Sequence, residues 1–201
     1  MNRCIKMYED QFKNIETTRI EELESFLNLI ADLDESIELF AIGGTAMVLK
    51  NIKESTKDID FMTMESYDKM RRLFNLAGLK EESPQKVCHI WRLGKIRIDI
   101  FYDGFIMGIP FPEDWKEKSE KLKEIGKIKL YILNWYDQII TKISRSEKRD
   151  IDDIIAIIKS QRLDFALLKE RYYSIAETAI ISDYDYKFKH LEEEYDKRKA
   201  D

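Results

Sequence analysis

The sequence is poor in cysteine, proline and glycine, and each scarcity narrows the class of protein. Its 201 residues include two cysteines, three prolines and seven glycines. Cys4 and Cys88 lie too far apart, and outside any metal-finger spacing, to support a disulfide framework or a zinc site, so we expect reduced thiols. With 36% charged residues, the small number of turn-forming residues favours long, charged helices over a turn-rich all-β fold.

Long apolar runs are missing as well. No segment approaches the roughly 20 apolar residues of a membrane span, and the N-terminus lacks the pattern of a signal peptide. We therefore expect a cytoplasmic protein with no membrane partner.

The net charge of −5 argues against a protein that coats nucleic acid nonspecifically, although a local basic groove remains compatible with it.

The residues that are present suffice for a folded core with several helices. Hydrophobic residues make up 44% of the chain, and its length suits one catalytic unit with a helical appendage. Apolar residues recur at three- and four-residue steps from Thr17 to Leu33, with Thr18 and Glu21 spaced as a capping box. The pattern predicts further helices over 66–79, 113–124, 134–143 and 147–159, followed by two charged helices.

Several short apolar segments predict a small sheet. Strands are expected at 39–42, around Asp58 to Phe61, at 87–93, at 96–102 and at 128–132, and Gly94-Lys95 suits a hairpin turn. The fold class is therefore α+β, a small mixed sheet with flanking helices plus C-terminal helices. We expect residues 1–133 to form the α/β core with its N-terminal helix, and residues 134–201 to form a helical portion packed on it. The role of residues 164–201 stays open.

Three aspartates carry the candidate chemistry. In a strand, Asp58 and Asp60 project from one face, where their mutual repulsion needs a cation or hydrogen bonds to neutralise it. Mg²⁺ prefers carboxylate and phosphate oxygens. Asp99 lies in a later strand on the face opposite the isoleucines, so sheet pairing could bring it beside the other two. A lone Asp-x-Asp in a strand is otherwise more often a solvated edge.

Gly43-Gly44 and Thr45 form a candidate phosphate-binding turn. Without Cβ atoms the backbone can turn tightly and let phosphate oxygens approach its N–H groups, and Thr45 could add a hydroxyl. The helix expected from Thr45 to Asn51 would add a dipole favourable to anions. The glycine pair alone is equally compatible with a plain strand-to-helix connection.

These segments together resemble a known superfamily. Ile42–Ala46, followed at the expected spacing by Asp58-Ile59-Asp60, is similar to the signature of the DNA polymerase β-like nucleotidyltransferases. The nearer likeness is to small prokaryotic proteins related to AbiEii-type toxins, whose second motif reads Thr-x-Asp-Ile-Asp as in Thr56–Asp60. Glu54 departs from the arginine that many relatives have two residues before that threonine. A downstream helical motif of these proteins is matched by Lys142, Arg145, Lys148, Asp150 and Asp153, with Arg149 inserted.

The resemblance implies a polymerase β-like fold and metal-dependent transfer of a nucleoside monophosphate from a nucleoside triphosphate to an acceptor. Mg²⁺ or Mn²⁺ would be the cofactor, and tRNA or a protein the acceptor, with a cognate antitoxin as partner in toxin-type relatives. A noncatalytic nucleotide-binding or regulatory module with the same fold is the alternative. The implied roles are metal binding by Asp58 and Asp60, a third metal ligand or general base at Asp99, phosphate binding by Gly43, Gly44, Thr45 and Lys142, and positioning of that lysine or of the acceptor by Asp150 and Asp153.

The residues of the helical motif also have ordinary interpretations. Lys142 shares its helix with Ile139, Ile140 and Ile143, so it could flank a core face without touching a ligand. Asp150 and Asp153 could favour the first turn of their helix through its dipole. The sequence leaves these alternatives open.

Overall fold

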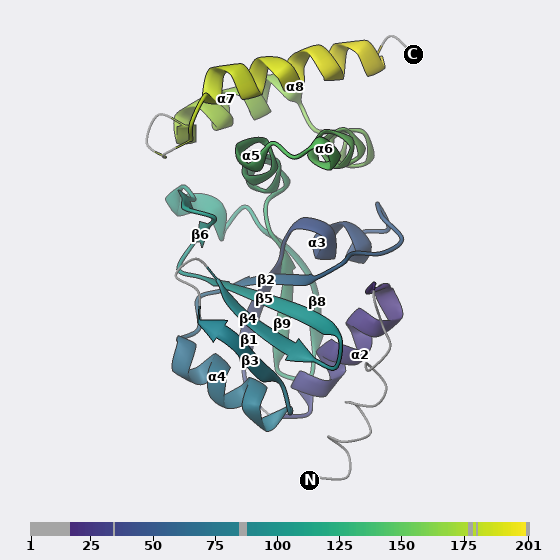
Figure 1. The fold of residues 1–201 in the computed structure, drawn as a ribbon, viewed down its shortest axis with the longest axis vertical. Helices are drawn as coiled ribbons and strands as arrows, with labels where there is room; N and C mark the ends of the chain where they lie inside the picture. The colour runs from purple at the N-terminus through teal and green to yellow at the C-terminus, as the bar shows by residue number, and fades with distance from the viewer. Residues whose placement is uncertain (1–16, 34, 85–87, 177–178, 180, 200–201) are drawn as a thin grey trace.

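The computed structural model describes residues 17–33, 35–84, 88–176, 179 and 181–199. A mixed seven-stranded sheet occupies the middle of the molecule, with helices around it and four more helices stacked beyond it towards the C-terminus (Figure 1). The elements are α2 Ile20–Ala31, β1 Ile37–Ala41, α3 Gly43–Leu49, β2 Ile59–Thr63, α4 Tyr67–Leu76, β3 Lys80–Pro84, β4 His89–Leu93, β5 Ile96–Tyr102, β6 Phe105–Ile106, β7 Ile109–Pro110, the 3-10 helix η1 Glu113–Trp115, β8 Glu120–Ile125, β9 Ile128–Ile132, α5 Trp135–Arg145, α6 Lys148–Gln161, α7 Phe165–Ala176 and α8 Tyr184–Lys199.

The strand order brings segments far apart in the sequence together. It runs β3-β4-β5-β2-β1-β9-β8, so β2 lies between β5 and β1 at the centre of the sheet. The pairs β2–β5 and β1–β9 are parallel, and the others are antiparallel. In the β2–β5 pair, Asp60 is the register partner of Asp99. The mixed sheet and flanking helices confirm the predicted fold class.

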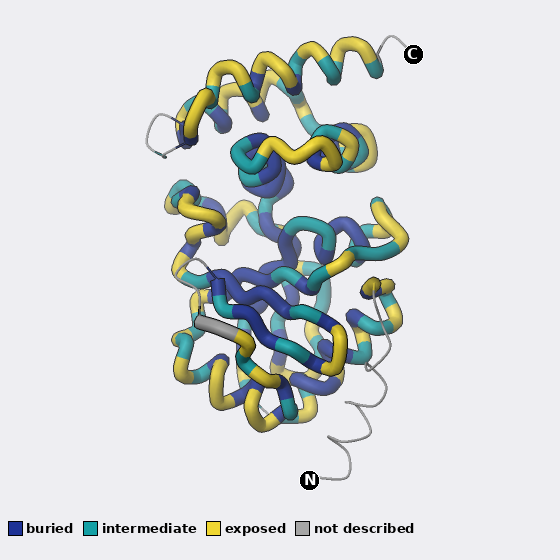
Figure 2. The backbone as a smooth tube through the Cα atoms, in the orientation of Figure 1, coloured by how far each residue is buried: buried dark blue, intermediate teal, exposed yellow. Residues whose placement is uncertain are grey.

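Both faces of the sheet are covered, although the alternation in the sequence predicted one wet face. Ile59 and Phe61 belong to the main core with α2 and α4, as the pattern indicated. The opposite face also has an apolar cluster, in which Met62 and Phe101 are buried with Trp115 of η1. The central strands accordingly appear dark blue in Figure 2. The face expected to be wet is therefore only partly so, because residues 105–115 fold over part of it.

Two helix starts differ from the predicted ones. Helix α2 begins at Ile20, and Arg19 N–H donates to the Glu22 carboxylate at 2.9 Å, one residue later than the predicted capping box. Thr18 instead forms an isolated antiparallel bridge with Thr56. Helix α3 begins at Gly43 instead of Thr45, so the glycine pair forms its first turn.

The helix predicted over 113–124 was wrong. Only η1 is helical there, and β8 pairs antiparallel with β9 at the edge of the sheet. Residues 120–125 are rich in lysine and glutamate, which suit a solvated helix as well as an exposed edge strand, so pairing with β9 decides the outcome. Strand β3 was not predicted. The strand predicted over 87–93 is observed as β4, His89–Leu93, and residue 87 lies outside the described residues.

A buried ion pair joins two of the C-terminal helices, and its arginine also reaches the rest of the fold. Arg171 of α7 contacts Asp137 of α5 through Nε–Oδ1 at 2.7 Å and Nη2–Oδ2 at 2.8 Å. The same guanidinium reaches Asp114 of η1 at 3.0 Å. Helices α7 and α8 match the two charged helices expected at this end of the sequence. Within the described residues, no helix combines the length and apolarity needed to cross a bilayer.

Candidate active site

A cleft of about 690 Å³ opens where β2, β5 and the start of α3 meet helices α5 and α6. Most of the residues singled out in the sequence line it together. They are Gly43, Gly44, Asp58, Asp60, Asp99, Lys142 and Asp153. Thr45 and Asp150 are not among the lining residues.

The carboxylates are brought together by strand pairing. Asp60 and Asp99 are partners on the parallel strands β2 and β5, and Asp58 directly precedes β2. Thr45 holds this end of β2 in place. Its Oγ1 accepts a hydrogen bond from Asp60 N–H at 2.8 Å and donates to the Asp58 carbonyl at 3.4 Å. Because Thr45 is fully buried, its observed contacts are with the strand.

The surroundings of Asp58 and Asp60 disfavour their negative charge. Burial raises the pKa of Asp60 to about 7, and the nearby charges of Asp99 and Asp58 act in the same direction. Lys142 and Arg145 oppose this rise through their positive charges. Burial also raises the pKa of Asp58. Carboxylates held this close favour protonation or a cation between them.

Arg97 is a residue of this site to which the sequence analysis assigned no role. Its Nε lies 2.7 Å from Asp99 Oδ1 and its Nη2 lies 2.7 Å from Oδ2, a two-point ion pair. Arg97 and Asp99 are two residues apart on one strand, so their side chains share a face, and this spacing was the available signal. With Asp99 paired in this way, no group of three His, Cys, Asp or Glu side chains in the described chain stands ready to hold a metal ion.

Each of the two glycines has its own structural requirement. Gly43 has φ +54°, and a Cβ there would come within 3.5 Å of Asp60 Oδ2. At Gly44 a Cβ would lie 2.2 Å from Thr56 Oγ1 and 2.9 Å from Thr56 Cβ. Gly43 thus brings the backbone close to a site carboxylate, while Gly44 allows helix α3 to pack on the segment before β2.

Lys142 and Arg145 of α5 form a positively charged side of the cleft, which we call the basic wall. Lys142 is only 5% exposed, and its Nζ lies 2.7 Å from Asp153 Oδ2 and 3.7 Å from Asp150 Oδ1. Lys53 also reaches Asp153, at 3.0 Å. Despite its burial, Asp153 has a lowered pKa because Lys142 and Lys53 stabilise its charge.

Asp150 supports this wall from inside the fold. It is 1% exposed, and it holds Arg145 through Nη2–Oδ1 at 2.5 Å and Nε–Oδ2 at 3.0 Å. It also accepts a hydrogen bond from Glu147 N–H at 3.0 Å, which fixes the start of α6. Asp150 therefore positions Arg145, which lines the cleft, and does not itself face the space.

A comparison with known protein families covers nearly the whole chain. Residues 18–200 match the family described as nucleotidyltransferase of unknown function (DUF6036). The chain belongs to this nucleotidyltransferase family. A search of curated proteins found no match.

Two solved structures share the fold of this nucleotidyltransferase at low sequence identity. The crystal structure of ANT(2″)-Ia in complex with adenylyl-2″-tobramycin has a TM-score of 0.58 at 12% identity, covering 79% of this chain and 98% of that one. The solution structure of the antibiotic-resistance factor ANT(2″)-Ia gives 0.60 at 10%, covering 80% and 94%. A nucleotidyltransferase from Thermotoga maritima gives 0.47 at 19%, covering 66% and 91%.

Asp58 and Asp60 offer oxygen donors of the kind that a divalent cation accepts. Among the described residues, no side chain forms an ion pair or hydrogen bond with the carboxylate of Asp58 or Asp60, and the pKa of both is raised. Oxygen ligands of this kind are those that Mg²⁺ and Mn²⁺ accept. Asp99 is held by Arg97, with which a metal ion would compete for the carboxylate oxygens.

Proposed function

We propose that this nucleotidyltransferase transfers a nucleoside monophosphate from a nucleoside triphosphate to an acceptor, with Mg²⁺ or Mn²⁺ held by Asp58, Asp60 and Asp99. The observation that carries the proposal is the register of β2 and β5. It sets Asp60 beside Asp99 in the cleft that Gly43 and Lys142 also line. Three carboxylates beside a glycine turn and a buried lysine form a suitable environment for the charge of a triphosphate.

Acidic and basic residues have different roles in the proposed reaction. Gly43 leaves room for phosphate oxygens near the backbone, and Lys142 and Arg145 offset the negative charge that develops on the leaving pyrophosphate. Asp99 accepts the proton of the acceptor hydroxyl once Arg97 has released it. Divalent metal, when bound, neutralises phosphate charge and lowers the pKa of a coordinated oxygen. Asp153 and Asp150 keep Lys142 and Arg145 in position.

The cleft takes residues from both sides of Asn134. Asp58 and Asp60 come from the first 133 residues, and Lys142 and Arg145 come from the helices that follow. We therefore propose that residues 1–133 and 134–201 are two parts of one catalytic unit, in which the first supplies carboxylates and the second supplies cations.

The acceptor is the open part of the proposal. Lys53, Lys57 and Arg149 also line the cleft, and cations at a cleft rim suit a phosphate-bearing acceptor such as tRNA. Transfer to tRNA, with a cognate antitoxin as partner, is the form of the proposal that follows from the resemblance to AbiEii-type toxins. A protein acceptor or the hydroxyl of a small molecule is the other form, the latter in line with the adenylylated tobramycin bound to ANT(2″)-Ia.

A transfer assay tests the proposal directly. The full chain would be incubated with Mg²⁺, each nucleoside triphosphate labelled at the α-phosphate, and in turn bulk tRNA, protein and aminoglycoside acceptors. We expect label transfer and pyrophosphate release that fall at least roughly 100-fold in Asp60→Asn. Asp152→Asn is the matched control, because Asp152 is 70% exposed on α6 and pairs with Arg198. Equal rates for the wild-type protein and Asp60→Asn would refute the assignment of this site.

A noncatalytic nucleotide-binding module is the second candidate, and one observation favours it. The two-point pair with Arg97 engages both oxygens of Asp99, the residue that a catalytic site needs free. The two candidates differ in calorimetry. A module binds nucleoside triphosphate with unchanged affinity in Asp99→Asn and releases no pyrophosphate with any acceptor, whereas an enzyme loses turnover in that variant.

A further inference from the structure

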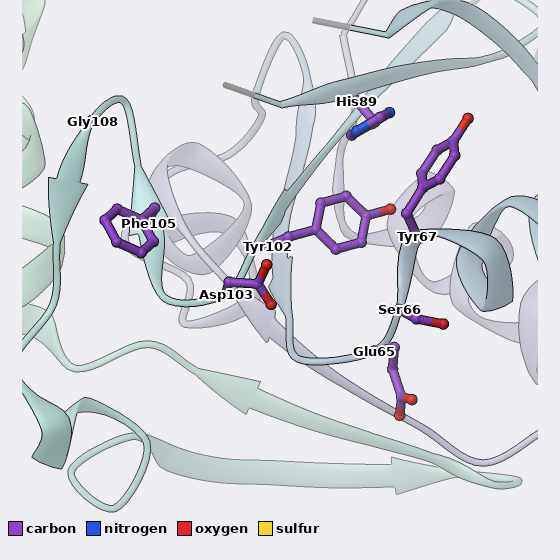
Figure 3. A pocket seen from close by; sticks show the side chains of 8 residues that line it. All are labelled: Glu65, Ser66, Tyr67, His89, Tyr102, Asp103, Phe105 and Gly108. Carbon is purple, nitrogen blue, oxygen red and sulfur yellow. The ribbon is translucent and has the colours of Figure 1, made fainter. Parts of the chain in front are cut away.

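A second cavity, of about 500 Å³, lies beyond the carboxyl ends of β2 and β5 (Figure 3). It is bounded by the start of α4, by His89 of β4, by Tyr102 and by the β6–β7 hairpin. Gly108 of that hairpin lines both this cavity and the active-site cleft. Tyr102 follows Asp99 by three residues, so its side chain leaves the opposite face of β5. The two spaces are therefore neighbours that share Gly108 and are otherwise lined by different residues.

Three rings form an aromatic corner in this cavity. The ring centroids of Tyr67 and His89 are 4.3 Å apart, and those of His89 and Tyr102 are 5.3 Å apart at 90°. Glu81, which does not line the cavity, fixes two of the rings. Its carboxylate accepts hydrogen bonds from the Tyr67 hydroxyl at 2.9 and 3.0 Å, and its Oε1 lies 3.1 Å from His89 Nδ1. The corner is thus held in place by hydrogen bonds before any ligand arrives.

The charge of this cavity is opposite to that of the active-site cleft. Its lining includes the carboxylates of Glu65 and Asp103 and no lysine or arginine. Glu65 pairs with Lys69 at 2.8 Å, whereas no described side chain forms an ion pair with Asp103. Figure 3 shows the Asp103 carboxylate between the rings of Tyr102 and Phe105. Aromatic faces and carboxylates both attract cations and repel phosphate.

One polar group in the wall is without a partner. The Tyr102 hydroxyl is buried and makes no hydrogen bond within the described residues. An unpaired buried hydroxyl is destabilising, and no hydrogen bond of this hydroxyl holds the Tyr102 ring in place. Nearby, the Arg71 guanidinium lies 6.0 Å from the centroid of the Tyr67 ring, so one member of the corner already attracts a cation.

We propose that this cavity binds an organic ammonium ion, with its charge against the rings of Tyr67, His89 and Tyr102 and beside the carboxylate of Asp103. The proposal does not depend on nucleotidyl transfer, because none of these side chains belongs to the acidic group of the cleft. The chemistry of the ligand follows from the lining, in which π faces and carboxylates supply the electrostatics and Phe105, 52% exposed, supplies an apolar rim.

Choline is a suitable probe because it has a neutral analogue of the same shape, 3,3-dimethyl-1-butanol. The chain contains two histidines, so the ring-proton NMR signals of His89 can be assigned by comparison with His190→Gln. The titration uses the full chain with chelator and without nucleotide. We expect choline to shift the His89 signals saturably, and the neutral analogue to bind roughly tenfold more weakly.

Substitutions then locate the site. Asp103→Asn keeps a residue that tolerates the positive φ of 58° and should weaken choline binding roughly threefold, while Tyr102→Leu should weaken it further. Asp152→Asn should bind choline as the wild-type protein does, and the amide spectrum of each variant reports whether it folds. Equal affinity for choline and its neutral analogue, the absence of a saturable shift at tens of millimolar, or unchanged binding in Asp103→Asn and Tyr102→Leu would each overturn the proposal.

Discussion

The Arg97 guanidinium donates a hydrogen bond to each carboxylate oxygen of Asp99, with Nε–Oδ1 and Nη2–Oδ2 distances of 2.7 Å each. The pair lies in the cleft beside Asp58 and Asp60, and its geometry is that of a strong charge-assisted interaction. It also raises the pKa of the guanidinium, chiefly through the hydrogen bonds to Asp99. Arg97 therefore occupies the place of a cation at the third carboxylate, and a divalent ion must compete with it.

Replacing Arg97 with glutamine should raise the affinity of the protein for Mn²⁺ by roughly tenfold, because the competing charge is removed. Calorimetric titration of the nucleotide-free protein with Mn²⁺ measures this. Arg72→Gln is the matched control, since Arg72 is exposed, pairs with Glu35 and does not line the cleft. Adding Asp99→Asn to the variant should remove the gain. An unchanged Mn²⁺ affinity in Arg97→Gln would show that Asp99 is no ligand.

Asp60 makes the metal-free protein less stable as the pH rises. Its pKa is about 7 in the folded protein and 3.8 ordinarily, so the folded state keeps a proton that the unfolded chain loses. The stabilisation from this proton is complete below pH 4 and is lost as the pH rises towards 7. Asp60→Asn lacks this dependence. Its stability relative to the wild-type protein should increase between pH 4.5 and 8, by at most about 4 kcal/mol.

Urea unfolding in the presence of chelator, at both pH values, measures the difference. Asp152→Asn, which changes an exposed carboxylate, should show no such trend. A constant stability difference between Asp60→Asn and the wild-type protein across this pH range would mean that Asp60 is not held protonated by its surroundings.

The sequence was sufficient where local pattern and chemistry agreed. Alternation around Asp58 and Asp60 places both on one strand face, and the isoleucines of β5 assign Asp99 to the corresponding face. The pairing of β2 with β5 could be anticipated but could not be established from local pattern, because it depends on the order of all seven strands. The pattern around 120–125 was ambiguous, since lysine and glutamate suit both a helix and an exposed edge strand.

Buried polar residues were the least accessible from sequence. Thr45 was predicted to bind phosphate and Asp150 to position Lys142 or the acceptor, and their observed partners are the backbone of β2 and the Arg145 guanidinium. Residue type and spacing give the same prediction for a ligand-facing hydroxyl and for one that braces a strand. Only the folded structure distinguishes the two cases. The same holds for Gly44, which is required because a Cβ there would collide with Thr56.

Lys142 provides the test of the basic wall. It is buried against Asp153 and faces the cleft, so Lys142→Met removes a cation from the proposed triphosphate site. We expect kcat for transfer to fall roughly 100- to 1,000-fold. Lys148→Met is the control, because Lys148 is exposed and outside the cleft lining. Urea midpoints separate lost folding from lost chemistry, and full activity in a folded Lys142→Met protein would leave this lysine a purely structural role.

Breaking the ion pair between Arg171 and Asp137 should strongly destabilise the protein, whereas replacing both residues with apolar ones should cost little stability. Asp137 is fully buried, and burial raises its pKa against the opposing effect of Arg171. Arg171→Met leaves this carboxylate buried without its partner and should lower the free energy of unfolding by about 3–5 kcal/mol. The double variant with Asp137→Leu removes the stranded charge and should regain most of that loss.

Urea denaturation compares these variants with Arg198→Met, which breaks an exposed pair with Asp152 and should cost at most about 1 kcal/mol. Stability that stays low in the double variant would mean that the ion pair itself, including its contact with Asp114, holds α5 and α7 against η1. Recovery would mean that apolar packing suffices there. The basic wall would then depend on burial of α5 against its neighbours, because Lys142 projects from the same helix as Asp137.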